Sequence, residues 1–186
     1  LIREVFRSIL EKNYKDKDFG KFYLQRKSLL RSLGNPIDEV VDFCKMVLQK
    51  EQSAIYYLTD NTTQEKELIL VLLEKYYQNI SKSELEKILS VVYPDLSLYL
   101  HDYRFNIPLL DGYFSMYTHS KVVNKVLPEL EEVVNQQAKL REYNLLLEPR
   151  TSKIDEIDKT NSQLYFMDAM GVEYLSYILS KCNEKG

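Results

Sequence analysis

Glycine and proline, the residues that most often end helices and form turns, are scarce in this chain. The 186-residue sequence holds five of each, whereas average usage would place about 13 glycines and about 9 prolines in a chain of this length. A β-sandwich or barrel needs a turn after each of its many short strands. The scarcity therefore disfavours those folds and predicts a mostly helical protein.

Composition narrows the class further. The apolar fraction of 45% and the charged fraction of 28% are ordinary, which disfavours disordered, collagen-like and membrane proteins. Fifteen tyrosines and no tryptophan indicate that amphipathic aromatic rings supply much of the core and its edges. The residues given show no signal-peptide pattern and no apolar run long enough to span a bilayer, so no membrane partner is expected. Cys44 and Cys182 match no metal-binding spacing, and we expect a cytoplasmic protein.

Apolar residues recur at helical spacing along nearly all of residues 1–148, which predicts a multi-helix module. Gly34 is expected to end one helix, and Asn35-Pro36 to begin the next with Asn as N-cap and Pro at the first helical position. Thr62 with Glu65, and Ser81 with Glu84, form capping boxes that each predict a helix start.

Three stretches of this module are less regular. Residues 55–58 fit either the end of a helix or a short strand. Residues 101–112 contain turn formers and predict a loop, with a helix from Tyr113 onward. Pro128 must kink that helix or begin a new one, because it has no N–H to donate.

The composition changes at residue 149. Residues 149–162 are polar and charged and predict a linker or a marginal helix. Leu164–Met167 is a compact apolar run, Asp168 and Gly171 follow it, and a helical pattern resumes at Val172. Residues 163–186 therefore predict a strand, an acidic turn and a helix, in contrast to the helical module before them.

Asp168 is a candidate ligand residue, because open α/β folds bind ligands beyond the carboxyl ends of their strands. A carboxylate there can hold a divalent metal or cap the following helix. Its position alone favours helix capping or another structural role over ligand binding. Two other families fit poorly. A haloacid-dehalogenase-type phosphatase needs a second Asp where Met170 stands, and a dinucleotide fold needs more glycines than Gly171 alone.

Charge is unevenly distributed. The net charge is −3 (25 − 28), yet residues 1–34 carry nine basic and four acidic side chains. A solvated helix face is the favoured interpretation, and contact with phosphate or an acidic partner is the alternative. The candidate nucleic-acid contacts are Arg3, Arg7, Lys12, Lys15, Lys17, Lys21, Arg26, Lys27 and Arg31.

Other polar and aromatic residues have structural explanations. His101, Asp102, Asp111 and His119 match no metal-ligand spacing, and we interpret the histidines as structural or surface residues. The tyrosine stripes predict core and core-edge positions rather than a base-stacking platform. A solvated helix face is expected to carry Glu129, Glu131, Glu132 and Glu142.

Several segments resemble the PglZ domain, a member of the alkaline phosphatase superfamily found in bacterial phage-exclusion (BREX) systems. LYFMDAMGVEYLSYI (164–178) looks like the opening strand, acidic turn and helix of that domain. YFSMYTHSKVVNKV (113–126) and REYNLLLEPRTSKID (141–155) are similar to the helical region that precedes it. YYLTDNTTQEKELI (56–69) resembles a further segment of these proteins.

The resemblance implies a domain organisation and a function. Residues 1–148 would be the helical module, 149–162 a linker, and 163–186 the first strand-helix unit of a truncated α/β phosphatase-like domain. Asp168 would match the first metal-ligand aspartate of a two-metal site, usually zinc. The nucleophile and the other ligands would lie beyond residue 186, so the chain is expected to be an excerpt of a longer hydrolase. By itself it would hold no cofactor and have no activity.

The implied role of this chain is a docking or scaffolding region in a phage-defence system, with other defence proteins as partners. The alternative is a stand-alone helical domain that binds protein or nucleic acid, in which residues 163–186 pack as a strand and helix on the helical bundle.

Overall fold

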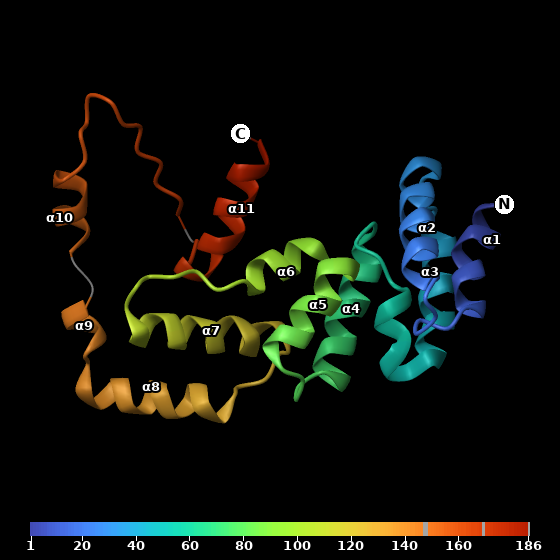
Figure 1. Ribbon diagram of the computed structural model, residues 1–186, viewed down its shortest axis with the longest axis horizontal. Coiled ribbons are helices and arrows are strands. Elements are labelled where there is room, and N and C mark those ends of the chain that lie inside the picture. Colours follow the sequence, from blue (N-terminus) through green and yellow to red (C-terminus); the bar gives the residue numbers. More distant parts are fainter. Residues whose placement is uncertain (147–148, 169, 186) are drawn as a thin grey trace. The chain divides into compact units, whose positions relative to one another are not determined.

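The chain folds mainly into helices, as its sequence predicts (Figure 1). The computed structural model describes residues 1–146, 149–168 and 170–185, and in these ranges it contains no strand. The chain divides into two compact units. Unit 1 comprises Leu1–Leu100 with Val122–Lys125, and unit 2 comprises His101–Lys121 with the residues from Val126 onward.

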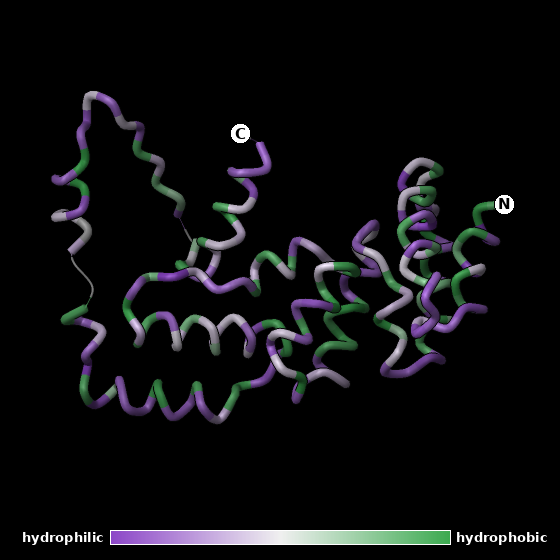
Figure 2. Tube along the Cα trace, in the orientation of Figure 1, coloured by the Kyte–Doolittle hydropathy of each residue, from purple (hydrophilic) through white to green (hydrophobic). Residues whose placement is uncertain are grey.

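Unit 1 is built from helices that surround one apolar core. Its elements are α1 (Ile2–Arg7), η1 (Ser8–Glu11), α2 (Phe19–Leu33), α3 (Ile37–Val47), η2 (Leu48–Tyr57), α4 (Thr63–Tyr76), α5 (Lys82–Val92) and α6 (Pro94–Leu100). Polar and apolar residues alternate along these helices (Figure 2), so each helix can turn one apolar face inward. Fully buried members of the core include Phe6, Ile9, Tyr23, Leu30, Phe43, Ile55, Leu72, Leu85 and Leu89.

Both predicted capping boxes are present in unit 1. The Thr62 hydroxyl accepts a hydrogen bond from the backbone N–H of Glu65 at 3.2 Å and thereby caps α4. The Ser81 hydroxyl accepts one from Glu84 N–H at 3.3 Å and caps α5. Each hydroxyl also donates to the carboxylate of the same glutamate, which completes the reciprocal pair.

The junction of α2 and α3 differs from the prediction by one residue. Helix α2 ends at Leu33, and Gly34 follows with a φ of 84°, a left-handed value that favours glycine. Pro36, not Asn35, is the N-cap of α3, which begins at Ile37 and has no side-chain cap. The extended ψ of 130° at Pro36 keeps it outside the helix.

The ambiguous residues 55–58 are a helix end. Ile55 belongs to η2, and the chain becomes extended at Leu58. Both side chains are fully buried. Their apolar character thus reflects insertion into the core of unit 1 and not a place in a sheet.

Unit 2 contains α7 (Pro108–Val122, whose last residue belongs to unit 1), α8 (Pro128–Leu140), α9 (Tyr143–Leu146), α10 (Arg150–Asp155), η3 (Val172–Tyr174) and α11 (Leu175–Lys185). Helix α7 begins five residues before the predicted start at Tyr113, because Pro108 tolerates a first-turn position and Asp111-Gly112 is absorbed into the helix. Pro128 begins a new helix, one of the two outcomes that the sequence allows.

The predicted strand-helix unit is present only in part. Helix α11 forms, but Leu164–Met167 has no regular structure and its side chains are 42–80% exposed. A strand needs a neighbour for its backbone N–H and C=O groups, and no described segment pairs with this one. The predicted linker contains the short helix α10, so it matches the marginal-helix interpretation. The predicted module boundary at residue 148, and Ala169 in the predicted turn, lie outside the described residues.

None of the helices in the described ranges is both long and apolar enough to cross a membrane.

Candidate functional site

Arg26 occupies the centre of a polar network inside unit 1. Its guanidinium lies over the rings of Phe43 and Phe6, at 4.5 and 5.6 Å from their centroids. The Nε atom donates to the carbonyl of Val5 at 3.2 Å, and Nη1 donates to that of Tyr57 at 3.4 Å. Burial lowers the pKa of Arg26 to about 10, although the Glu65 carboxylate opposes this shift. The side chain therefore joins α1, α2 and η2 and cannot reach an external ligand.

Glu65 supplies the compensating charge and is fully buried. One carboxylate oxygen accepts the Thr59 N–H at 3.1 Å, and the other accepts the Thr59 and Thr62 hydroxyls at 3.1 and 3.0 Å. Burial raises the pKa of Glu65, while Arg26 and these hydrogen bonds lower it. Three hydrogen bonds to the Glu65 carboxylate thus fasten the start of α4 to the preceding loop.

Lys27 and Asp60 form a second, nearly buried pair at the edge of this network. Their charged atoms are 2.7 Å apart, and the side chains are only 9% and 14% exposed. Lys27 also donates to the carbonyl of Val91, which ties α2 to α5. Arg31 reaches the same Asp60 oxygen at 3.2 Å and donates to the Asn61 side chain at 2.7 Å.

The remaining candidate basic residues are scattered among other contacts. Arg3 pairs with Glu39 and Asp42, and Arg7 lies 4.0 Å from Asp42. The ammonium of Lys12 lies over the ring of Phe22 and that of Lys15 over Tyr14. Lys17 and Lys21 are exposed.

Five of the nine candidates, Arg3, Arg7, Arg26, Lys27 and Arg31, therefore hold helices of unit 1 together through hydrogen bonds and ion pairs. The structure does not present the nine as one open cationic face. The geometry favours a structural role for the basic N-terminal residues over contact with nucleic acid, which depends on accessible cations.

The candidate metal ligand Asp168 lies in a turn and is exposed. Within the described ranges, no three His, Cys, Asp or Glu side chains gather as a metal site would require. Asp111 accepts the backbone N–H of Phe105 at 2.6 Å and thereby fixes the loop before α7. His101 is exposed and His119 is half-buried on α7. The cysteine thiol of Cys44 is a poor nucleophile, because burial raises its pKa to about 12.

An apolar groove of about 490 Å³ in unit 2 is the feature that sequence reasoning missed. Aromatic and aliphatic side chains of α7 form one wall, namely Leu109, Leu110, Tyr113 and Phe114. The facing wall comes from α8 and consists of Val133, Val134, Gln137 and Ala138. Phe105, Tyr143 and Val172 complete the lining.

Among the described lining residues, Tyr113 and Tyr143 carry hydroxyls and Gln137 carries an amide. The Gln137 amide already has hydrogen-bond partners. Its Nε2 donates to Glu142 at 2.7 Å, and its Oε1 accepts the Tyr143 N–H at 3.3 Å. None of the described residues that line the groove is charged. It is consequently suited to an uncharged, apolar occupant.

Aromatic rings continue along the α7 side of the groove. Phe105 and Phe114 lie 5.2 Å apart, and Tyr113 stacks on Tyr117 at 5.8 Å. In the sequence, the tyrosines among these rings form a stripe at helical spacing, which predicts positions in the core or at its edge. They are half-buried, as at a core edge. The unfilled space beside them depends on side chains of another helix, α8, and left no mark in the stripe itself.

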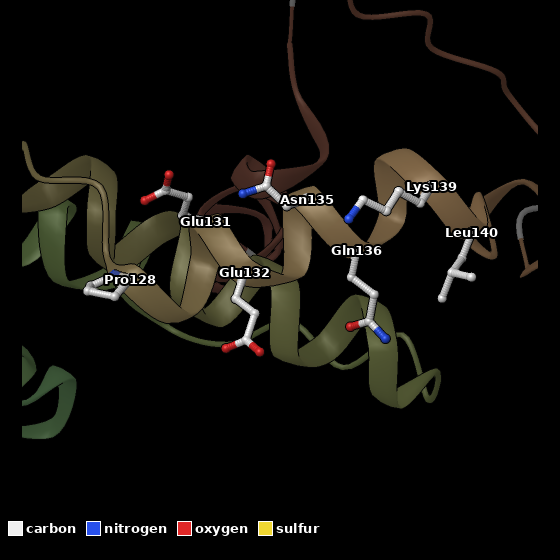
Figure 3. Close-up of a pocket in the computed structure, with 7 residues that line it drawn as sticks. All are labelled: Pro128, Glu131, Glu132, Asn135, Gln136, Lys139 and Leu140. Carbon is white, nitrogen blue, oxygen red and sulfur yellow. The ribbon is translucent and has the colours of Figure 1, made fainter.

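The opposite face of α8 carries a shallow polar surface (Figure 3). All its lining residues come from this one helix: Pro128, Glu131, Glu132, Asn135, Gln136, Lys139 and Leu140. Glu129 and Glu142 are exposed as well. The predicted solvated acidic helix face is confirmed for Glu129, Glu131 and Glu132, whereas Glu142 lies in the turn after α8. A surface made by one helix is not an enclosed binding site.

Comparison with known proteins covers the first part of the chain. A family model described as a domain of unknown function (DUF7863) matches residues 1–76, which end with α4. Arg26, Glu65 and the Lys27–Asp60 pair all lie within that match. No curated protein and no solved structure matches the chain.

Proposed function

We propose that this chain is a non-catalytic helical docking module and that the groove between α7 and α8 is its docking site. The groove carries the proposal, because its walls expose an uncharged apolar surface. Surfaces of this kind mark binding sites for apolar side chains of a partner. The occupant we propose is a short uncharged segment rich in aromatic and aliphatic residues.

The resemblance to PglZ proteins extends the proposal to a larger context. In that context the module would precede a metal-dependent hydrolase of a phage-defence system, and other defence proteins would be its partners. Leu164–Met167 would become a strand once neighbouring strands supply backbone partners. Asp168 would then stand at the end of that strand as one ligand of a zinc site, and the chemistry would require further ligands from outside this chain.

The docking function is tested with a labelled peptide of sequence NSQLYFM, which is uncharged and matches residues 161–167. The protein for this assay carries serine at positions 164–167, so that its own segment cannot compete. We expect saturable binding that Ala138→Glu weakens by about tenfold or more, because the bound peptide would have to cover a carboxylate in the apolar groove wall.

Gln136→Glu is the matched control for this assay. It places the same charge on the same helix, but on the polar face shown in Figure 3, and should leave the affinity unchanged. No peptide binding, or equal loss in both variants, would contradict the docking site.

The hydrolase context has separate tests. The coding sequence should continue past the codon for Gly186 with strand-helix units and further Asp and His residues, and a stop codon there would contradict it. The isolated chain should neither bind zinc tightly nor hydrolyse bis(p-nitrophenyl) phosphate. Turnover that disappears in Asp168→Ala would show that the module is itself catalytic.

A further inference from the structure

We infer that the segment Leu164–Met167 is an internal ligand of the α7–α8 groove and docks into it within the same chain. This inference rests on the proposed docking function, since it names what occupies the groove when no partner is bound. The segment would then regulate docking, because a partner must displace it.

The segment has the chemistry that the groove requires. Tyr165 and Phe166 are 80% and 71% exposed, and Leu164 and Met167 are 42% and 55% exposed. Four consecutive apolar side chains in water are unfavourable, and burial of their surface is the main force that would move them. The seven residues 161–167 carry no charge, so no ionised group would have to enter the groove with them.

The groove walls expose apolar surface that such a segment would cover. Within the described part of unit 2, the buried apolar side chains are Leu110 and Leu130, one on each of the two long helices, and they are still 6% and 7% exposed. Between those helices, Val134 is 47% exposed although it lines the groove. Side chains of an apolar segment would cover this surface and complete a core that α7 and α8 leave open.

Chain connectivity brings the two together. Val172 lines the groove and stands five residues after Met167, a distance that an extended chain spans in about 17 Å. Such a short connection gives an effective concentration on the order of millimolar, which favours docking within one chain over docking between two copies. The same side chains cannot fill the groove and a sheet at once, so strand pairing of this segment would open the groove to a partner.

Cysteine cross-linking tests the contact directly. In a Cys182→Ser background, Phe166→Cys is combined with Ala138→Cys, which lies in the groove wall. Cys44 stays in place, since burial raises its pKa to about 12 and keeps it unreactive. The control pairs Phe166→Cys with Gln136→Cys, two residues away and about 200° around the helix.

Under mild oxidation we expect the groove pair to form a monomer-sized disulfide about tenfold or more faster than the control pair, because a disulfide needs Cα atoms within about 7 Å. Non-reducing electrophoresis and mass spectrometry would identify the product. Equal rates for both pairs overturn the inference. Dimer-sized products from the groove pair overturn it too, because they would place the segment in a second copy.

The NSQLYFM peptide separates failure of this inference from failure of the docking function. The peptide should bind the wild-type chain about tenfold more weakly than the chain with serine at positions 164–167, since only the wild type has an internal competitor. Equal binding to both overturns the internal ligand and leaves the docking site standing. No binding to the serine variant overturns the docking site itself.

Discussion

Units 1 and 2 are both built from amphipathic helices, but they differ in how completely their apolar side chains are buried. In unit 1, side chains such as Phe43 and Leu85 are at most 1% exposed, and buried charged groups such as Glu65 and Lys27 have hydrogen-bond or ion-pair partners. In unit 2, the facing surfaces of α7 and α8 enclose an unfilled apolar groove. Helix formation therefore does not by itself ensure a complete core, because a core also needs enough surrounding elements to cover every apolar face.

The two units also differ in what their charged residues do. Arg26 and Glu65 lie inside unit 1 and connect helices. Glu131 and Glu132 lie on the exposed face of α8 and contact solvent. A closed unit with internal polar contacts is suited to be a rigid support, and an open one to bind. Four predictions test this contrast.

The largest effect is expected from a cavity in unit 1. Leu85→Ala removes a fully buried side chain from α5 and should lower the free energy of unfolding by about 2–5 kcal/mol. Leu145→Ala, at an 88% exposed position of unit 2, should change it by less than about 0.5 kcal/mol. Urea denaturation followed by circular dichroism measures both. Similar losses in the two variants would erase the contrast between the units.

A smaller loss is expected when a buried charge loses its partner. Lys27→Ala leaves Asp60 nearly buried with only Arg31 beside it, which should cost about 1–3 kcal/mol. Lys21→Ala, on the same helix but exposed, is the control and should be nearly neutral. Equal stability of the two variants would mean that the pair behaves as a surface ion pair.

The pH dependence of stability should reveal the burial of Glu65. Burial raises its pKa above the ordinary value of 4.5, so the folded state binds a proton that the unfolded state has already released in this range. The stability of the wild type relative to Glu65→Gln should then rise as the pH falls from neutral toward 4.5, by up to about 1.4 kcal/mol per pH unit.

Comparing the two proteins at each pH removes the titration of the other carboxylates from the difference. A wild-type advantage that shrinks as the pH falls would mean that hydrogen bonds and Arg26 outweigh burial and lower the pKa of Glu65.

The smallest effect is a local one. Ser81→Ala removes the cap of α5 and should cost about 1 kcal/mol. Ser90→Ala lies in the last turn of the same helix, where alanine is at least as favourable, so it should cost nothing. Thermal unfolding of both variants distinguishes them. An equal response would show that the cap adds nothing to a helix already held by the core of unit 1.

Much of the fold could be predicted from local patterns. Thr62 and Ser81 mark helix starts because their hydroxyls bond to an N–H three residues later. Gly34 marks a helix end because of its positive φ. The prediction failed at Leu164–Met167, where an apolar run has the composition of a strand but no described partner. It was also one residue early at the start of α3, where Pro36 takes the cap position.

The candidate sites were less predictable. Glu65 was recognisable as a capping residue, but its burial and its charge interaction with Arg26 depend on packing among α1, α2 and η2. Lys27 and the exposed Lys21 lie on the same helix, and the ion pair of Lys27 depends on Asp60, which lies 33 positions further along the chain. The tyrosine stripe indicated a core edge at Tyr113 and did not indicate the space beside it.

The sequence by itself determined that this protein is helical, and where most of its helices begin and end, because spacing and capping act within three or four residues. Only the tertiary structure decided which charges are buried and where apolar surface stays open. Those outcomes depend on residues far apart in the chain, such as Lys27 with Val91 or Leu109 with Ala138. No local pattern in the sequence encodes that proximity. The proposed docking groove is the clearest example, because it forms only where α7 and α8 face each other.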